Sequence, residues 1–334
     1  MKCPYCLSQT KPSLEKREFR TVYVCSNKSC SAEIHRDYVE QINTQRGFIG
    51  LVGFSGHGKT SYLTILFYLL RQLTRLNTWN DFYFQTLDEN THRIIYNVVN
   101  ILEKKSELPE STPQNFPLPS LIYFKNIYLF GDYFISFYDT AGAVYEDINR
   151  ITNMGRFVAG SDVVFFIISI NDCGTDFITE MERLLDIYVN AVYNHLRINL
   201  RENQHLIIVL TKGDMILNLP DNIKIFLQEG SYKWYKINNK TDSNLKSLKN
   251  ISEEIKIWLE KMGGRGFIRR ANDKFKSVEF TLVSSTGAAP SGIKLSTKLK
   301  PEDPKRILDP FLWALEKISK KRLIRNRWWE LWHS

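Results

Sequence analysis

Short apolar runs alternate along this chain with longer stretches whose apolar residues recur at helical spacing. The runs 48–52, 163–168 and 206–210 are continuously hydrophobic, as strands are when helices cover both faces of a parallel sheet. A stretch with helical periodicity, such as 60–76 or 176–198, follows an apolar run. This alternation predicts an α/β fold with a doubly wound, mostly parallel sheet.

The apolar run 121–130 and the alternating run 133–138 are separated only by Gly131-Asp132. Such spacing predicts one antiparallel hairpin at the edge of the sheet. Insertions are expected at about 77–120 and 215–275, and the second contains a polar surface segment. The expected strands are 48–53, 121–130, 133–138, 163–170, 206–210 and 278–283, the expected helices are 60–76, 144–159, 176–198, 251–261 and 305–331, and the polar surface segment is 232–249.

Four of the five cysteines lie within the first 30 residues, in two pairs. Cys3 and Cys6 form a CxxC pair, and Cys25 and Cys30 form a wider one. Four thiolates on two short loops can close a tetrahedral Zn²⁺ site, and a segment this small needs such a staple to fold. We therefore expect a small N-terminal zinc ribbon over residues 1–46, with His35 as an alternative fourth ligand.

A glycine-rich loop follows the first apolar run. Residues 53–60 read GFSGHGKT between an expected strand and an expected helix, which is the GxxxxGK[ST] pattern in the context that a phosphate-binding loop requires. In such a loop backbone N–H groups surround a phosphate, the lysine bridges two phosphates and the hydroxyl ligates Mg²⁺. The residues expected to hold the nucleotide here are Gly53, Ser55, Gly56, His57, Gly58, Lys59, Thr60 and Ser61.

Two later motifs also follow expected strands. The sequence DTAG, in which Asp139 is the first residue and Gly142 the last, would bring a carboxylate to the metal and a glycine N–H to the terminal phosphate. Mg²⁺ is then expected on Thr60 and Asp139.

The second motif, TKGD, runs from Thr211 to Asp214. The Asp214 carboxylate can accept hydrogen bonds from the ring N–H and the exocyclic amino group of guanine together, which adenine does not offer. The Lys212 stem would cover the base. A weaker fourth signal is the run 278–283, which leads into small residues whose backbone would meet the guanine carbonyl: Ser284, Ser285 and Thr286.

In their order and spacing these motifs resemble those of the translation-factor-related GTPases, the Ras-like class of P-loop proteins. The resemblance covers about residues 47–325 and implies a switch that binds and hydrolyses GTP. With the ribbon in front, the architecture is also similar to bacterial double-GTPase conflict-system GTPases, which implies a role in defence and a protein partner: a second GTPase, an activator or an effector. The residues expected to serve catalysis are Lys59, Thr60, Thr112, Asp139 and Gly142.

One position departs from the Ras-like pattern. The residue after the DxxG glycine is commonly a glutamine that orients the attacking water, and here it is Ala143. The resemblance therefore implies slow hydrolysis by the protein alone. The nearby residues Glu146, Arg150 and Arg156 are alternatives for that role. The switch threonine is expected at Thr112, in a proline-rich stretch for which a plain exposed loop is the alternative.

Charge and composition set the remaining expectations. The net charge is +9, and the surplus falls on residues 1–46 and 291–334, while 47–290 is balanced. No apolar run approaches the roughly 20 residues of a membrane span, and the first residues lack a signal-peptide pattern. We expect a cytoplasmic protein of two parts, the ribbon and a GTPase domain over 47–334.

The basic, tryptophan-rich C-terminus, expected to be helical, is a candidate surface for a protein partner or a membrane surface. It carries Trp328, Trp329 and Trp332 after a run of lysines and arginines. Two other functions are open: a nucleic-acid-binding module regulated by GTP, and a scaffold that binds GTP without hydrolysing it.

Overall fold

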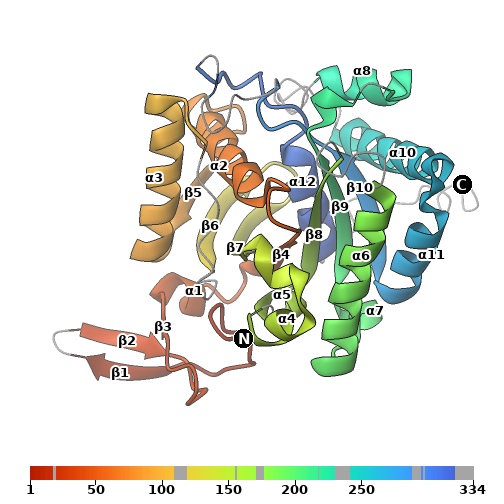
Figure 1. Ribbon diagram of the computed structural model, residues 1–334. Helices are drawn as coiled ribbons and strands as arrows, with labels where there is room; N and C mark the ends of the chain where they lie inside the picture. The colour runs from red at the N-terminus through yellow and green to blue at the C-terminus, as the bar shows by residue number, and fades with distance from the viewer. Residues whose placement is uncertain are drawn as a thin grey trace, which may run out of the picture.

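A seven-stranded sheet forms the centre of the protein, with the strands in the spatial order β10-β9-β8-β4-β7-β6-β5 (Figure 1). The computed structural model describes residues 1–17, 20–108, 119–154, 156–170, 177–216, 218–229, 241–287, 295 and 298–319. The strands from β10 to β7 run parallel to one another, and β6 and β5 continue the sheet in antiparallel pairs. The strands are β4 (Gln45–Val52), β5 (Tyr83–Thr86), β6 (Ser120–Ile127), β7 (Gly131–Asp139), β8 (Val163–Ser169), β9 (His205–Thr211) and β10 (Ser277–Leu282).

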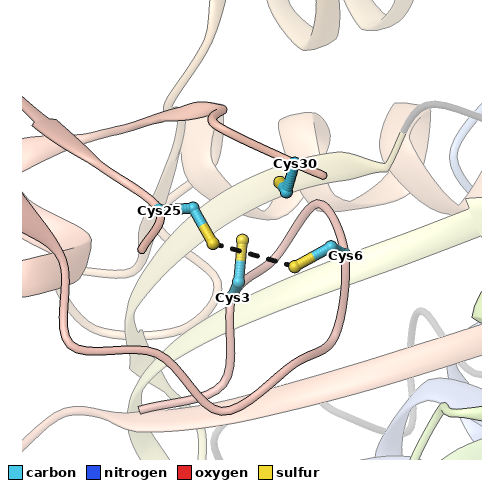
Figure 2. Close-up of side chains that lie close together, drawn as sticks. All are labelled: Cys3, Cys6, Cys25 and Cys30. Atoms are coloured by element: carbon cyan, nitrogen blue, oxygen red, sulfur yellow. Dashed lines mark hydrogen bonds between the residues drawn. The ribbon is translucent and has the colours of Figure 1, made fainter. Parts of the chain in front are cut away.

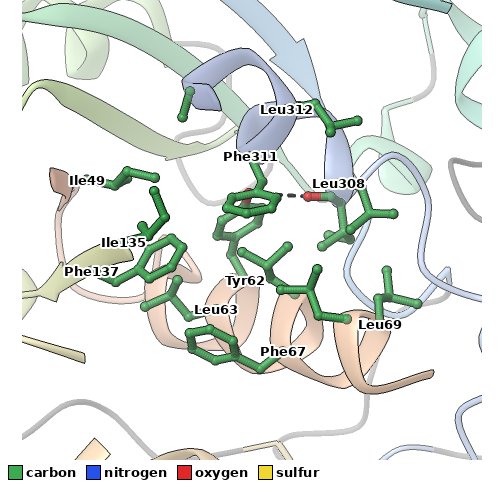
Figure 3. Close-up of a cluster of buried hydrophobic side chains, with 14 of the residues drawn as sticks. Ile49, Tyr62, Leu63, Phe67, Leu69, Ile135, Phe137, Leu308, Phe311 and Leu312 are labelled. Atoms are coloured by element: carbon green, nitrogen blue, oxygen red, sulfur yellow. Dashed lines mark hydrogen bonds between the residues drawn. The ribbon is translucent and has the colours of Figure 1, made fainter. Parts of the chain in front are cut away.

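Helices cover both faces of this sheet. On one face α2, α3 and α12 pack against the strands, and Figure 3 shows Tyr62 of α2 and Phe311 of α12 beside Ile135 and Phe137 of β7. On the other face α4, α5, α6 and α11 close a second core. The longer helices are α2 (Lys59–Arg75), α3 (Glu89–Lys105), α6 (Phe177–Val189), α8 (Asp221–Glu229), α10 (Thr241–Leu259), α11 (Arg265–Lys274) and α12 (Leu308–Ile318), and the shorter ones are α4 (Ile148–Met154), α5 (Arg156–Ala159) and α7 (Leu200–Asn203).

The N-terminal segment folds as a three-stranded antiparallel sheet followed by a short helix. Its elements are β1 (Ser13–Arg17), β2 (Arg20–Val24), β3 (Glu33–Ile34) and α1 (Arg36–Glu40). Cys3, Cys25 and Tyr38 of this segment share one buried cluster with Tyr123 of β6 and Phe134 of β7. The segment therefore covers part of the large sheet in the way that a helix does elsewhere.

The edge of the sheet differs from its expected form. The hairpin of β6 and β7 is present, but its turn lies before Gly131 rather than at Gly131-Asp132. The register shifts between Phe124 and Ile127, and both Leu129 and Gly131 have positive φ. In addition β5, inside the first expected insertion, extends the sheet by an antiparallel strand that the apolar pattern did not reveal.

Several expected helices also end or break elsewhere. The stretch 144–159 is divided into a 3-10 helix (Gly142–Glu146), α4 and α5, because Asp147 is extended and its carboxylate caps α4. Within the described residues, the helix expected over 305–331 begins at Leu308 and ends at Ile318, because Arg306 has a φ of +60° and Ser319 is extended.

The second expected insertion is partly helical. Helix α10 begins at Thr241, so part of the polar segment 232–249 is helical, and the rest lies outside the described residues. The tryptophan-rich tail 320–334 lies outside them as well. In the part of the chain that the structure describes, none of the helices is long and apolar enough to cross a membrane.

The contact between the N-terminal segment and the large sheet predicts a stability effect. Phe134 is almost fully buried, with its ring centroid 5.2 Å from Tyr38 and 5.0 Å from Tyr123. We expect Phe134→Ala to lower the free energy of unfolding by about 3–5 kcal/mol through the cavity it leaves. Ile42→Ala, at a highly exposed apolar residue of the same region, should cost less than about 0.5 kcal/mol. Urea denaturation measures both, and equal effects would contradict this packing.

Candidate nucleotide site and metal centre

The loops that carry the motifs meet at the carboxyl-terminal ends of the parallel strands. Strand β4 leads into the loop 53–58, β7 into the DTAG sequence, β9 into TKGD and β10 into residues 284–286. Ligands of open α/β sheets bind at this edge. The pairing of β4 with β7 sets Leu51 opposite Asp139, so both strands reach the edge together.

The loop 53–58 has the backbone that its glycines allow. Gly56 and Gly58 have φ of +81° and +86°, values that side chains other than glycine rarely adopt. At Gly53 a Cβ atom would lie 2.4 Å from the carbonyl oxygen of Ile167 in β8. The loop is therefore held tightly against β8 and then turned so that α2 starts at Lys59, with its N-terminal N–H groups at the expected phosphate site.

His57 holds the loop from behind. Its ring is almost fully buried, its Nδ1 lies 3.3 Å from the carbonyl oxygen of Ile167, and the ring meets Phe54 edge-on at 5.6 Å. The Thr211 hydroxyl donates to the His57 carbonyl at 3.1 Å. The side chain of His57 thus serves the shape of the loop, and what it offers a ligand is its backbone.

Lys59 is folded into its own loop. Its Nζ donates to the carbonyl oxygens of Gly53 at 2.7 Å and Phe54 at 3.1 Å. Burial lowers the pKa of Lys59 to about 8, against the attraction of the Asp139 and Glu146 carboxylates. A bound phosphate would place a negative charge next to this buried ammonium and so favour its charged form.

The DTAG sequence lies directly against the phosphate loop. The Thr60 hydroxyl donates to the Asp139 carboxylate at 3.0 Å, which places the two expected magnesium ligands side by side. At Gly142 a Cβ atom would lie 2.2 Å from the backbone nitrogen of Ser55. Only glycine permits this approach, so the two loops form a single surface.

The loops expected to bind guanine are tied to each other. The Gly213 N–H donates to the Val283 carbonyl at 3.0 Å, and the preceding Lys212 has a φ of +59°. Asp214 follows on a short 3-10 helix (Gly213–Met215) with an exposed side chain. The carboxylate is therefore open to a ligand beside the phosphate loop, to which Thr211 is bonded.

At the end of β10 the roles of the three expected residues separate. Ser284 is fully buried and exchanges both of its backbone hydrogen bonds with Lys305, while its hydroxyl accepts from the Gly287 N–H at 3.0 Å. Its backbone is thus occupied by the fold. Ser285 and Thr286 are half-buried, and they are the members of the trio that remain as candidates for the guanine carbonyl.

Sequence patterns missed a buried ion pair beneath these loops. Arg306 donates through Nε to Asp309 at 2.6 Å, and its guanidinium lies 3.6 Å from the centre of the Phe226 ring on α8. Both charged side chains are almost fully buried. Because α8 follows the Asp214 loop and Lys305 pairs with Ser284, this cluster fixes the two guanine-side loops relative to each other. In the sequence, two opposite charges three residues apart look the same as an exposed ion pair on a helix surface. For this reason the buried pair was not predicted.

The residues proposed to orient water lie beside the DTAG sequence, as far as they are described. Arg150 donates to the carbonyl oxygen of Ala143 at 3.4 Å, and Glu146 is exposed and near enough to Lys59 to influence its pKa. The side chain of Arg156 and all of Thr112, the expected switch threonine, lie outside the described residues.

The four N-terminal cysteines converge as a metal centre requires. Their sulfur atoms all lie within 4.8 Å of one another, and Figure 2 shows the two pairs facing a common centre. Cys6 and Cys25 are 3.8 Å apart between their Sγ atoms, the separation of two ligands at a tetrahedral site with metal–sulfur distances of about 2.3 Å. All four are free thiols. The set fits Zn²⁺.

The thiols of this cluster differ in how readily they lose a proton. Burial raises the pKa of Cys30 to about 11 and that of Cys3 further still. For Cys6, burial is the largest single influence, but the hydrogen bonds from Ser8, Cys3 and Cys30 together outweigh it and lower the pKa to about 7. A divalent cation would offset the cost of burying several thiolates together.

The alternative ligand His35 lies outside the cluster. Its Nδ1 accepts from the Asp37 N–H at 3.2 Å and caps α1, while Cys30 completes the four sulfur atoms. The wider spacing of the second pair is taken up by a turn in which Cys30 and Ser31 donate their N–H groups to the Asn27 carbonyl. The fourth member of the cluster is therefore Cys30 and not His35.

Comparison with known proteins adds little. No protein-family model matches the chain, and no curated protein is significantly similar to it. Among solved structures it is similar to Era in complex with MgGDPNP and nucleotides 1506–1542 of 16S ribosomal RNA, at 14% identity and a TM-score of 0.36. The alignment covers 83% of this chain and 58% of the Era chain. A likeness this loose carries no argument about function.

The cysteine cluster predicts one bound zinc per chain. Elemental analysis of purified protein should find one equivalent of zinc in the wild type and in His35→Ala, which loses only a helix cap. Cys30→Ser should lose most of the metal, because a hydroxyl is a far poorer zinc ligand than a thiolate. Zinc near zero in the wild type with all thiols titrating freely, or zinc loss in His35→Ala alone, would contradict the assignment.

Proposed function

We propose that this protein is a GTP-binding and GTP-hydrolysing molecular switch with a structural zinc ribbon. The observation that carries the proposal is the joined surface of the phosphate loop and the DTAG sequence, where Thr60 meets Asp139 and Gly142 meets Ser55. A terminal phosphate placed there would touch both loops, and its loss on hydrolysis would release one of them. That difference is what a switch transmits.

The phosphate end would work by electrostatics. The N–H groups at the start of α2 and the Lys59 ammonium would hold the β- and γ-phosphates. Thr60 and Asp139 would hold Mg²⁺, which neutralises the charge that develops on the phosphates during transfer. The Gly142 N–H would bond the γ-phosphate, so the DTAG loop would sense whether that phosphate is present.

The guanine end would discriminate by hydrogen-bonding pattern. The exposed Asp214 carboxylate would accept the ring N–H and amino group of guanine, with the Lys212 stem over the base and the N–H groups of Ser285 or Thr286 toward its carbonyl. The Gly213–Val283 bond and the Arg306–Asp309 pair hold these elements in place before the ligand arrives. Preorganised donors and acceptors of this kind reject a base with the wrong pattern.

Hydrolysis is proposed to be slow without help. Ala143 has no group that can orient water, and its carbonyl accepts from Arg150. We propose Arg150, whose side chain reaches the residue after Gly142, as a group that would assist hydrolysis, with Glu146 and Arg156 as alternatives and Thr112 as the proposed switch threonine. A protein partner, such as a second GTPase, an activator or an effector, would raise the rate, and a cytoplasmic role in bacterial defence follows the same resemblance.

Guanine selectivity tests the proposal directly. We expect GTP to displace a fluorescent GTP analogue from the wild type and ATP to fail at a 100-fold excess. Asp214→Ala should weaken GTP binding by about 100-fold or more, because two charge-assisted hydrogen bonds are lost. Asp221→Ala, an exposed acidic residue at the start of α8, is the matched control and should bind normally. Equal competition by ATP would refute the role of Asp214.

The buried lysine predicts proton uptake on binding. Lys59 has a lowered pKa of about 8, and a bound triphosphate raises it, so the fraction that is neutral before binding takes up a proton. Calorimetry in buffers of different ionisation enthalpy should show uptake of about 0.1 proton at pH 7, about 0.5 at pH 8 and about 0.9 at pH 9. Lys59→Arg, which stays charged throughout, should show little. Uptake that does not change with pH in the wild type would contradict this account.

A further inference from the structure

The residue before Asp139 is hydrogen-bonded to the loop that carries the first two cysteines. Tyr138, on β7, is fully buried, and its hydroxyl donates to the carbonyl oxygen of Pro4 at 2.5 Å. Pro4 stands between Cys3 and Cys6, within the first pair of thiols. One side chain therefore connects the loop that carries two of the four sulfur atoms to the strand that ends in the expected magnesium ligand.

The same N-terminal loop also contacts the strand that leads into the phosphate loop, through a hydrogen bond and an ion pair that involve Asp162. Lys2 donates through Nζ to the Gly160 carbonyl at 2.6 Å and lies 3.7 Å from the Asp162 carboxylate. That carboxylate in turn accepts the N–H of Phe48 on β4 at 3.0 Å. Leu7, just after the CxxC pair, packs against the core that contains Phe48 and Tyr138. The strands that lead into the phosphate loop and into the DTAG sequence, β4 and β7, are thus both anchored to this N-terminal loop.

Tyr138 cannot shift without moving its neighbour. Its ring stacks on Phe157 of α5 at 5.9 Å between centroids, inside a core packed on all sides. Tyr138 and Asp139 are consecutive residues of β7 whose side chains point to opposite faces of the sheet. A backbone displacement at Tyr138 would therefore also move Asp139. Such a displacement would disturb the 3.0 Å bond from the Thr60 hydroxyl to the Asp139 carboxylate.

We propose that Tyr138 is a positioning residue that couples metal binding at the four cysteines to magnesium–nucleotide binding at Thr60 and Asp139. The inference rests on the proposed function. A metal on the cysteines fixes the Pro4 carbonyl, the carbonyl fixes Tyr138, and Tyr138 holds Asp139 in register with Thr60. Coupling between two binding equilibria is reciprocal. Bound nucleotide should therefore raise the affinity for zinc by the same factor by which bound zinc raises the affinity for the nucleotide.

The experiment measures that factor on the full chain. The dissociation constant for zinc is determined by competition with a fluorescent zinc chelator, with and without guanylyl imidodiphosphate and excess Mg²⁺. The wild type should hold zinc about 3- to 10-fold more tightly with the nucleotide, the range that one buried hydrogen bond supplies. Tyr138→Phe should reduce that factor to about one. This variant should still bind zinc, both with and without the nucleotide.

Tyr188→Phe is the matched control. Tyr188 is equally buried in the same core and loses a comparable bond, from its hydroxyl to Gln204 at 2.8 Å, far along the chain from the cysteines. Both variants should lose similar thermal stability, and Tyr188→Phe should keep the full coupling factor. A loss of coupling in both would mean a general structural effect and would overturn the role of Tyr138.

The remaining outcomes separate the two proposals. If the wild type binds the nucleotide but its affinity for zinc is unchanged, the coupling is wrong and the switch function stands. If Tyr138→Phe keeps the wild-type factor, the coupling does not pass through this hydroxyl and the positioning role fails. If zinc-loaded protein does not bind the nucleotide at all, the proposed function fails, and the coupling falls with it.

Discussion

The parallel register between β4 and β7 is the constraint on which the candidate site depends. Leu51 pairs with Asp139, and this pairing brings the end of β7 beside the start of α2, where Thr60 meets Asp139. A slip of one residue would turn Asp139 toward the opposite face of the sheet. The register is held by the cores on both faces, in which Ile135 and Phe137 pack on one side and Tyr138 on the other.

The N-terminal segment belongs to this arrangement and is more than an appendage. It covers Phe134 and Tyr123 of the large sheet, and it is hydrogen-bonded through Pro4 to Tyr138 of β7 and through Lys2 to Gly160. The small N-terminal sheet gains a hydrophobic partner surface, and the large sheet gains a cover. The basic charge of residues 1–46 therefore lies partly in contacts within the protein, as the Lys2–Asp162 pair illustrates.

Local sequence predicted the features that depend on local physics. The glycines of the loop 53–58 specify its backbone, the buried strands read as continuous apolar runs, and the CxxC spacing indicated the cysteine cluster. The contacts that the sequence did not reveal join distant residues: Tyr138 with Pro4, and Arg306 with Phe226. Such pairs depend on the packing of whole elements, which residue spacing along the chain does not encode.

Boundaries were least predictable where backbone conformation competes with apolar pattern. Strand β5 is short, and every second residue in it is exposed while the others are only partly buried. It therefore lacks the apolar pattern of an interior strand. The 144–159 stretch has helical periodicity, yet the cap at Asp147 breaks it. For Ser284, the sequence indicated a strand end with small residues, but its pairing with Lys305 depends on a segment twenty residues later.

The central claim is that the phosphate loop and the DTAG sequence form one site for Mg²⁺ and GTP. A crystal structure with guanylyl imidodiphosphate, Mg²⁺ and zinc tests it most directly. We expect the γ-phosphate against Lys59 and the Gly142 N–H, Mg²⁺ at Thr60 with Asp139 beside it, and the guanine on Asp214. Nucleotide bound elsewhere, or phosphates in the loop with no contact from the DTAG sequence, would contradict the account.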